Sequence, residues 1–410
     1  MFPPAQAGIE LVGRLDPLGY NYAGLCSATK KGLHVHSGYQ FPLIWLRDSC
    51  QCPNCIHPDN KQKLFSSGEL DAEAKLDSAS VREDLGPEPV LEVRWGGLGL
   101  NRESSGGSHT SHYPFSWLTA NAPFDASGSP RPHFELPKHQ LWSGREFSEV
   151  HNFIPYDEFM DPSKGGLYRA LVQMAEYGLF FLEGVPIEDS KVTEVASRIG
   201  VVYNTFYGAS WDVRSVPNAE NIAYTSLSLG LHMDLCYFEA PPGLQFLHCL
   251  QNSVEGGTSI FLDSFKAAMM FRERHPDHFA VLEQVPVTFH YYNNNRHFRY
   301  RSPTFITTDP NEPLIVRYAP PFQGPMEFGH PDEVGPFYRA MAKFEQYLSN
   351  PALQFQLTLQ PGQVAVFHNR RVLHARTAFD GSSGLRHLKG TYVLYDDFKS
   401  CLRSEIARHR

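Results

Sequence analysis

Short apolar segments separated by turn residues dominate the second part of the chain. Their size and their β-branched and aromatic residues predict strands at 179–185, 243–251, 259–263, 287–292, 314–319, 363–368 and 390–395. Two segments instead repeat apolar residues at helical spacing: Leu167 to Ala175, which Gly178 is expected to end, and Phe337 to Tyr347. The pattern therefore predicts a mixed α+β fold in which helices pack outside short strands.

The first part of the chain leads into a cluster of cysteines. Residues 38–50 (GYQFPLIWLRDSC) are expected to form an apolar strand that runs into this cluster, and 90–95 to form a second strand. Residues 66–90 are polar and are predicted to be poor in strands. Four prolines within 119–140 indicate an interdomain linker. We therefore expect two domains, at 1–140 and 141–410.

The composition narrows the range of partners. Hydrophobic residues make up 42% and charged residues 20% of the 410 residues, which is typical of a globular protein. The net charge of -8, without a dense lysine or arginine run, gives no electrostatic support for a nucleic-acid partner. No apolar stretch approaches the roughly 20 residues that cross a bilayer, and the start resembles neither a secretion signal nor a transit peptide. We expect a cytoplasmic protein that binds a small-molecule substrate, and neither nucleic acid nor membrane.

One motif in the second part has the residue types of a metal site. His232 and Asp234 form an H-x-D tripeptide, and His374 follows much later in the chain. Side chains two apart in an extended chain point to the same side, so His232 and Asp234 can bind one ion. A second histidine completes a two-histidine, one-carboxylate face, which leaves iron(II) positions open for a 2-oxo acid and oxygen. Alone, H-x-D is weak evidence, because 19 histidines and 44 acidic residues make it frequent by chance.

Arg386 supplies a second, independent feature. It lies on the next candidate strand after His374. The remote carboxylate of 2-oxoglutarate needs a bidentate cationic partner inside the core, whereas most arginines are surface charges. Together with the three candidate ligands, Arg386 predicts an iron(II)- and 2-oxoglutarate-dependent oxygenase.

The cysteines indicate a second metal site. Seven cysteines are present, and Cys50, Cys52 and Cys55 lie within six residues, which does not resemble a disulfide framework. A tetrahedral structural zinc needs one donor besides three thiolates. His57 and His109 are nearby candidates, although His57 is close to Cys55 for closing the same tetrahedron. Three buried thiols without a metal are the alternative.

Several motifs together resemble a known superfamily. H-x-D followed by PPGLQFLHC and GGTS, and NRRVLHARTAF followed by Arg386, resemble the taurine dioxygenase-like oxygenases. Within this superfamily the chain is similar to the gamma-butyrobetaine dioxygenases, because LIWLRDSCQCPNC resembles the small zinc-binding domain that precedes their oxygenase core. The resemblance covers nearly the whole chain, and the occurrence of both halves together is highly specific.

The resemblance implies a double-stranded β-helix, a jelly-roll core with iron at its mouth, preceded by a small β-rich zinc-binding domain. Fe(II) would be bound by His232, Asp234 and His374, and the far carboxylate of the co-substrate 2-oxoglutarate by Arg386. Leu247 and Ser259 fall where the family lines the co-substrate pocket. Matching the family's motif makes His112, in SHYPFSWL, the fourth ligand of a structural Zn(II), with His109 as its competitor.

The resemblance also indicates the charge of the substrate. A quaternary ammonium has no N–H to donate and is recognised by aromatic faces. The family builds such a cage at the positions of Tyr207, Trp211, Tyr224 and Tyr392. Any one of these aromatics is ordinary core by itself, but four matches favour a cage. Asn221 matches a family position that contacts the substrate carboxylate.

The acid end of the substrate is less well defined by the resemblance. Pro320 and Pro321 stand where animal members carry asparagines, and prolines have no backbone donor. The resemblance implies hydroxylation of gamma-butyrobetaine at C3 to L-carnitine, coupled to decarboxylation of 2-oxoglutarate, with ascorbate as reductant and a homodimeric assembly. Trimethyllysine dioxygenase, which tends to lack the full cysteine set, and an oxygenase for another betaine-like metabolite are the enzyme alternatives. An oxygenase-fold binding protein without catalysis is the remaining one.

Overall fold

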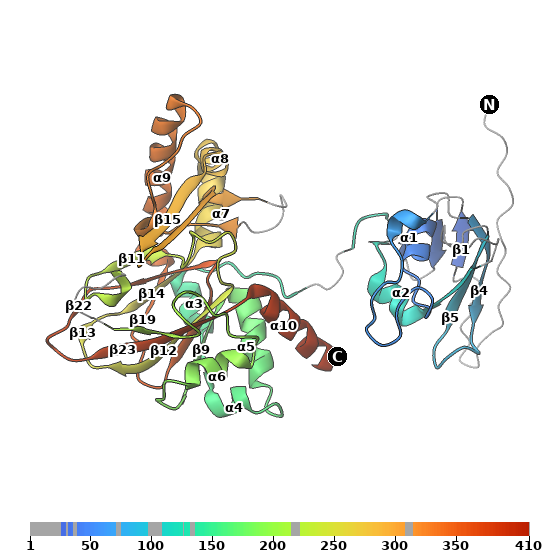
Figure 1. Ribbon diagram of the computed structural model, residues 1–410, viewed down its shortest axis with the longest axis horizontal. Coiled ribbons are helices and arrows are strands. Elements are labelled where there is room, and N and C mark those ends of the chain that lie inside the picture. Colours follow the sequence, from blue (N-terminus) through green and yellow to red (C-terminus); the bar gives the residue numbers. More distant parts are fainter. Residues whose placement is uncertain are drawn as a thin grey trace. The chain divides into compact units, whose positions relative to one another are not determined.

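The computed structural model describes residues 26–29, 32–35, 39–70, 75–96, 109–125, 127–131, 136–214, 222–307 and 315–409 (Figure 1). The chain divides into two compact units, Met1–Glu135 and Leu136–Arg410, where the sequence predicted a boundary near residue 140. Each unit has its own hydrophobic core. No helix in the described ranges is long and apolar enough to span a membrane.

The described part of the first unit contains two antiparallel sheets and two short α-helices. The sheets have the strand orders β1-β2-β3-β7 and β4-β5-β6. Phe41, Leu46 and Trp95 contribute to one core cluster. The elements are β1 (Cys26–Thr29), β2 (Gly32–Val35), β3 (Tyr39–Phe41), α1 (Leu43–Asp48), β4 (Lys75–Arg82), β5 (Val90–Gly96), β6 (His109–Pro114), α2 (Phe115–Asn121) and β7 (Phe124–Asp125).

Two predictions for this unit are wrong. The strand expected over 38–50 ends at Phe41, because Pro42, with its fixed φ and missing N–H, suits a helix start and the following residues form α1. The polar segment 66–90 contains the strand β4, which pairs along its length with β5. Its polarity arises because β4 is an edge strand that buries only part of its surface, including Ala79.

Two packed sheets form the centre of the second unit. Their strand orders are β10-β23-β12-β20-β9-β8 and β11-β21-β14-β19. Phe181 and Phe367 from the first sheet and Phe261 from the second share one core cluster, so the sheets pack face to face. The strands are β8 (Phe153–Pro155), β9 (Leu179–Glu183), β10 (Trp211–Val213), β11 (Leu229–His232), β12 (Leu244–Asn252), β14 (Ser259–Asp263), β19 (Gln354–Leu357), β20 (Val364–His368), β21 (Val372–Arg376) and β23 (Arg386–Val393).

Helices cover the outside of this assembly, as the pattern predicted (Figure 1). Residues of α5, α6 and α10 share a core cluster with Phe246 and Val366, which lie on the face of the six-stranded sheet turned away from the four-stranded sheet. The predicted face of α5 is buried, and Gly178, with φ of 72°, ends this helix. The helices are α3 (Gly144–Val150), α4 (Tyr156–Met160), α5 (Gly166–Tyr177), α6 (Lys191–Ser197), α7 (Ser264–Arg274), α8 (Pro276–Gln284), α9 (Val334–Leu348) and α10 (Tyr395–His409).

Three two-stranded antiparallel sheets complete the second unit within the described ranges. They are β13 (Glu255–Gly256) with β22 (Phe379–Asp380), β15 (Val287–Asn293) with β16 (Arg296–Ser302), and β17 (Phe305–Ile306) with β18 (Ile315–Val316). The strand predicted at 314–319 is therefore shorter than expected. A 3₁₀ turn at Pro320–Phe322 follows it, because two consecutive prolines cannot donate to a strand ladder.

Candidate active site and zinc centre

A cavity of about 770 Å³, its open mouth included, lies in the second unit. It brings together residues from both packed sheets and from the loops between them. Asn221, the predicted carboxylate contact, lies outside the described residues. Every other site residue predicted for this unit lines the cavity: His232, Asp234, His374, Arg386, Leu247, Ser259, Tyr207, Trp211, Tyr224 and Tyr392.

Strand pairing brings the three candidate metal ligands together. β11 pairs with β21 so that His232 lies directly opposite His374, and their ring centroids are 4.1 Å apart. Oδ1 of Asp234 lies 3.3 Å from Nε2 of His232 and 4.0 Å from Nε2 of His374. One donor atom from each residue lies within 4.8 Å of the others. Two imidazoles and one carboxylate in this arrangement fit iron(II) and leave one side of the ion open.

Asp234 reaches this position from a turn, and not from the extended segment that the sequence analysis assumed for His232 and Asp234. β11 ends at His232, and Leu235 adopts a left-handed φ of 58°. The fully buried Asn369 accepts a hydrogen bond from the Asp234 N–H at 2.9 Å and donates to the Asp234 carbonyl at 3.0 Å. Asn369 therefore holds the backbone that carries the carboxylate. Sequence analysis missed it, because nothing local shows which distant backbone an asparagine binds.

The surroundings of the triad favour an ionised Asp234 and a neutral His374, which are the forms that bind a cation. Burial opposes ionisation of the Asp234 carboxyl, but the hydrogen bond from His232 and the electrostatic contributions of the two histidine rings outweigh it and hold its pKa below its usual range. Burial, with the adjacent His232, lowers the pKa of His374 to about 3, so its ring is neutral and has a free lone pair at pH 7. The Tyr392 hydroxyl donates to Oδ2 of Asp234 at 2.6 Å. Burial and the Asp234 charge raise the pKa of Tyr392, so it stays a donor.

Arg386 is a buried cation that forms no ion pair with any carboxylate among the described residues. Arg386 is the first residue of β23 and is 8% exposed. Its Nε has no hydrogen-bond partner in the part of the chain that the structure describes. Burial lowers its pKa to about 10, so the guanidinium remains charged at neutral pH. An unpaired buried charge is costly, which indicates that a ligand carboxylate completes this site. Leu247 and Ser259 line the same cavity.

A second buried arginine, Arg376, has a different role. Its guanidinium donates to the carbonyl oxygens of Ala223, Thr225 and Leu227 at 3.1, 2.8 and 2.6 Å. It therefore ties the segment around Tyr224 to β21, the strand of His374. Sequence analysis missed Arg376, although its position two residues after His374 places it on the same face of the strand.

Aromatic side chains form one wall of the cavity. The rings of Trp211 and Tyr392 lie 4.2 Å apart, and that of Tyr207 lies 6.3 Å from Trp211. A Cβ at Gly390 would come within 2.4 Å of the Trp211 ring, so only glycine allows β23 to approach β10 here. Tyr237 and Phe322, which the sequence analysis did not single out, also line the cavity.

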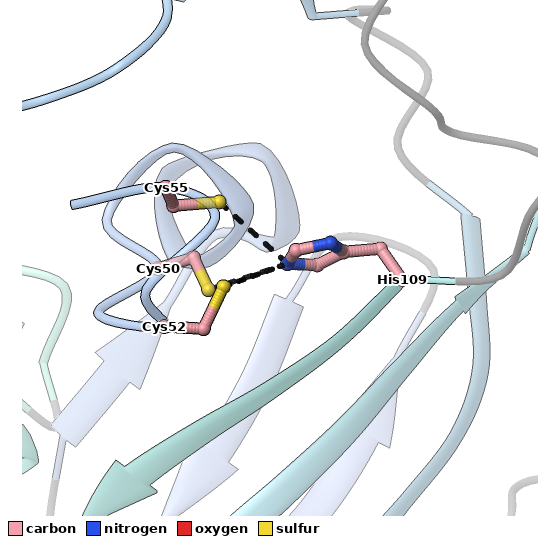
Figure 2. A group of neighbouring side chains, drawn as sticks. All are labelled: Cys50, Cys52, Cys55 and His109. Carbon is pink, nitrogen blue, oxygen red and sulfur yellow. Dashed lines mark hydrogen bonds between the residues drawn. The ribbon is translucent and has the colours of Figure 1, made fainter. Parts of the chain in front are cut away.

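In the first unit, the three predicted cysteines meet one histidine (Figure 2). Nε2 of His109 lies 3.3, 3.8 and 3.7 Å from the sulfurs of Cys50, Cys52 and Cys55. A hydrogen bond from Cys55 outweighs burial and holds the pKa of Cys50 well below its usual range. Arg47 donates to the Cys55 sulfur at 3.4 Å. Three sulfurs and one imidazole are the donor set of a structural zinc.

The structure corrects the fourth donor from His112 to His109. Both residues are on β6, but side chains three apart on a strand point to opposite faces. Nε2 of His112 instead lies 3.1 Å from the carboxylate of Glu92, its direct partner on β5. The match to the family motif therefore predicted a zinc ligand on the correct strand, β6, but on the opposite face of that strand.

Replacing His109 by alanine is expected to reduce bound zinc from one ion per chain to a small fraction, because one of four ligands is lost. The matched variant His112→Ala, on the same strand, should keep its zinc. Metal analysis of the purified full chains measures both. Zinc loss in His112→Ala but not in His109→Ala would restore the original assignment.

Comparison with known proteins agrees with these features. A family model described as "Taurine catabolism dioxygenase TauD, TfdA family" matches residues 146–392, and one described as "Gamma-butyrobetaine hydroxylase-like, N-terminal" matches residues 33–119. Dioxygenase str8 of Strobilurus tenacellus is 35% identical over 90% of this chain and 86% of its own. Gamma-butyrobetaine dioxygenase of Pseudomonas sp. (strain AK-1) is 33% identical over 88% of this chain and 89% of its own. Trimethyllysine dioxygenase of Meyerozyma guilliermondii is 28% identical over 88% of this chain and 90% of its own.

The match to the first model covers more than half of the chain and contains the triad, Arg386 and the aromatic wall. The match to the second contains the cysteine cluster and His109. The chain therefore belongs to the TauD, TfdA family of the Fe(II)/2-oxoglutarate oxygenase superfamily.

Proposed function

We propose that this protein hydroxylates gamma-butyrobetaine (4-trimethylammoniobutanoate) at C3 to L-carnitine. The observation that carries the proposal is a single cavity lined by the two-histidine, one-carboxylate triad, the unpaired Arg386 and four aromatic cage candidates. The triad suits iron(II), Arg386 suits a dicarboxylic co-substrate, and the aromatic side chains suit a quaternary ammonium. A betaine oxygenase needs all three in one place.

Iron(II) and 2-oxoglutarate, when bound, supply the oxidative chemistry that hydroxylates an unactivated C–H bond. His232, Asp234 and His374 hold the metal, while Asn369 keeps the backbone of Asp234 in place. Arg386 receives the far carboxylate of 2-oxoglutarate, and Leu247 and Ser259 shape the space next to it.

The aromatic wall determines where the substrate lies. Tyr207, Trp211, Tyr224 and Tyr392 hold the trimethylammonium group by cation–π attraction. Tyr392 links this cage to the metal site, because its ring lies against that of Trp211 and its hydroxyl donates to Asp234. The cage thereby orients the methylene chain toward the open side of the triad and excludes water from it.

We also infer the roles of the two units of the chain. The first unit is the zinc-binding domain, held by Cys50, Cys52, Cys55 and His109, and its zinc is structural because protein donors fill all four positions. The two packed sheets of the second unit form the jelly-roll core. Arg47, which donates to the Cys55 sulfur, offsets part of the negative charge of three thiolates.

Turnover of a substrate panel tests the proposed function. The protein is supplied with iron(II), ascorbate, 2-oxoglutarate and either gamma-butyrobetaine or trimethyllysine, and succinate and hydroxylated product are quantified. We expect product from gamma-butyrobetaine and none from trimethyllysine. Turnover of trimethyllysine alone would favour the second candidate, which the 28% identity to a trimethyllysine dioxygenase motivates. No turnover of any betaine by folded, iron-loaded protein would refute the proposal.

A further inference from the structure

Gln245 is a buried polar residue of the cavity that the roles above do not use. It lies on β12, is 2% exposed and lines the cavity. Its Oε1 atom is buried and has no hydrogen-bond partner among the residues that the structure describes. A buried acceptor that is left unsatisfied costs stability, so an orphaned amide in a cavity indicates an interaction with a ligand.

Strand register shows which ligand Gln245 faces. On β12, Gln245 pairs directly with Tyr392 of β23, whereas Asn252, at the other end, pairs with Arg386. The cavity therefore has a co-substrate end at Arg386 and a cage end at Tyr392. Directly paired residues on neighbouring strands have Cβ atoms about 5 Å apart and point to the same face of the sheet, so the side chains of Gln245 and Tyr392 start next to each other. Gln245 belongs to the cage end.

The hydroxyl of Tyr392, the residue that pairs directly with Gln245, donates to Asp234 and therefore does not satisfy the Gln245 oxygen. A trimethylammonium group has no N–H, but its positive charge is spread over its methyl groups. Such a group is attracted both by ring faces and by a carbonyl oxygen, and it satisfies an acceptor without donating a conventional hydrogen bond.

We infer that Gln245 is a specificity-determining residue, which adds an amide oxygen to the aromatic cage and selects a permanent cation over a neutral group of the same shape. The inference rests on the proposed function, because it assumes that the cage holds a trimethylammonium group. An aromatic cage alone favours a cation through ring faces and also accepts a neutral tert-butyl group by apolar contact. A fixed carbonyl dipole increases the discrimination, since it attracts only the charged ligand.

The test compares gamma-butyrobetaine with its carbon isostere 5,5-dimethylhexanoate, in which carbon replaces the charged nitrogen. Binding of each is measured by calorimetry on wild type and on Gln245→Met, which keeps the side-chain length and removes the amide. We expect the preference of wild type for the charged ligand to fall about threefold in Gln245→Met, the scale of a weak C–H···O contact. Affinity for 5,5-dimethylhexanoate and for 2-oxoglutarate should stay unchanged.

Two further variants make the result specific. Gln251→Met, an exposed glutamine on the same strand, is the matched control and should retain the wild-type preference. Gln245→Glu keeps oxygen acceptors at the same place and should retain a preference for the charged ligand, which also provides a test if the methionine variant does not fold. A glutamate variant that loses the preference would contradict the inference.

The outcomes separate the inference from the proposed function. Wild type that prefers the charged ligand, with an equal preference in Gln245→Met, overturns the inference and leaves the betaine proposal intact. Wild type that binds neither ligand, or binds both equally, overturns the betaine proposal and the inference together. A reduced preference in Gln245→Met with unchanged 2-oxoglutarate affinity supports both.

Discussion

Replacement of Asp234 by alanine is expected to abolish coupled turnover while the zinc centre keeps its metal. The variant removes the carboxylate ligand of the triad and leaves only the two imidazoles. Loss of an outer-shell partner of a metal site costs about 10- to 100-fold in affinity or activity, so loss of a direct ligand should exceed that range. Succinate formation measures activity, and metal analysis of the same sample should show zinc near one ion per chain and iron greatly reduced.

The control for this variant is Asp277→Ala, which removes an exposed aspartate at the start of α8. It should keep both metals and wild-type turnover. An Asp234→Ala protein that loses zinc and retains iron would show that the two metal sites are wrongly assigned. Retained turnover would remove Asp234 from the catalytic centre.

Replacement of Arg386 by methionine is expected to raise the KM for 2-oxoglutarate about 100-fold, because a bidentate pair comprises two charge-assisted hydrogen bonds. Methionine keeps much of the apolar stem of the side chain and removes the guanidinium, which lies over the Phe379 ring. A second readout uses 2-oxopentanoate, which lacks the far carboxylate. Wild type should discriminate strongly against it, and Arg386→Met should discriminate little.

The matched control is Arg274→Met, an exposed arginine at the end of α7. Its kinetics with both oxo acids should equal those of wild type. If Arg386→Met discriminates between the two acids as wild type does, the far carboxylate binds elsewhere, and the co-substrate end of the cavity must be reassigned.

The sequence alone determined features that depend on local patterns and residue types. The buried face of α5 and its end at Gly178 followed from helical spacing and from the conformational freedom of glycine, and the structure confirms both. His232, Asp234, His374 and Arg386 were recognised because few other functions require this chemistry, and the structure places them in one cavity.

Wrong predictions arose where local and tertiary preferences differ. The apolar run after Pro42 suits a strand or a helix, and packing of Leu46 into the core of the first unit decides for the helix. The polar strand β4 has little apolar alternation, and it forms because β5 offers a partner edge. The spacing of apolar residues and the composition of a segment do not show which core or which strand it will pack against.

Only the tertiary structure decided which side chains share a space. His109 and His112 have similar sequence surroundings. His109 is the candidate ligand because it lies on the face of β6 that meets the cysteines, whereas His112 lies on the other face, against Glu92. Asn369 and Gln245 became visible through contacts and register with distant segments. Residue chemistry is local and can be read along the chain, whereas the direction of a side chain depends on strand pairing between segments far apart, which a single sequence does not specify.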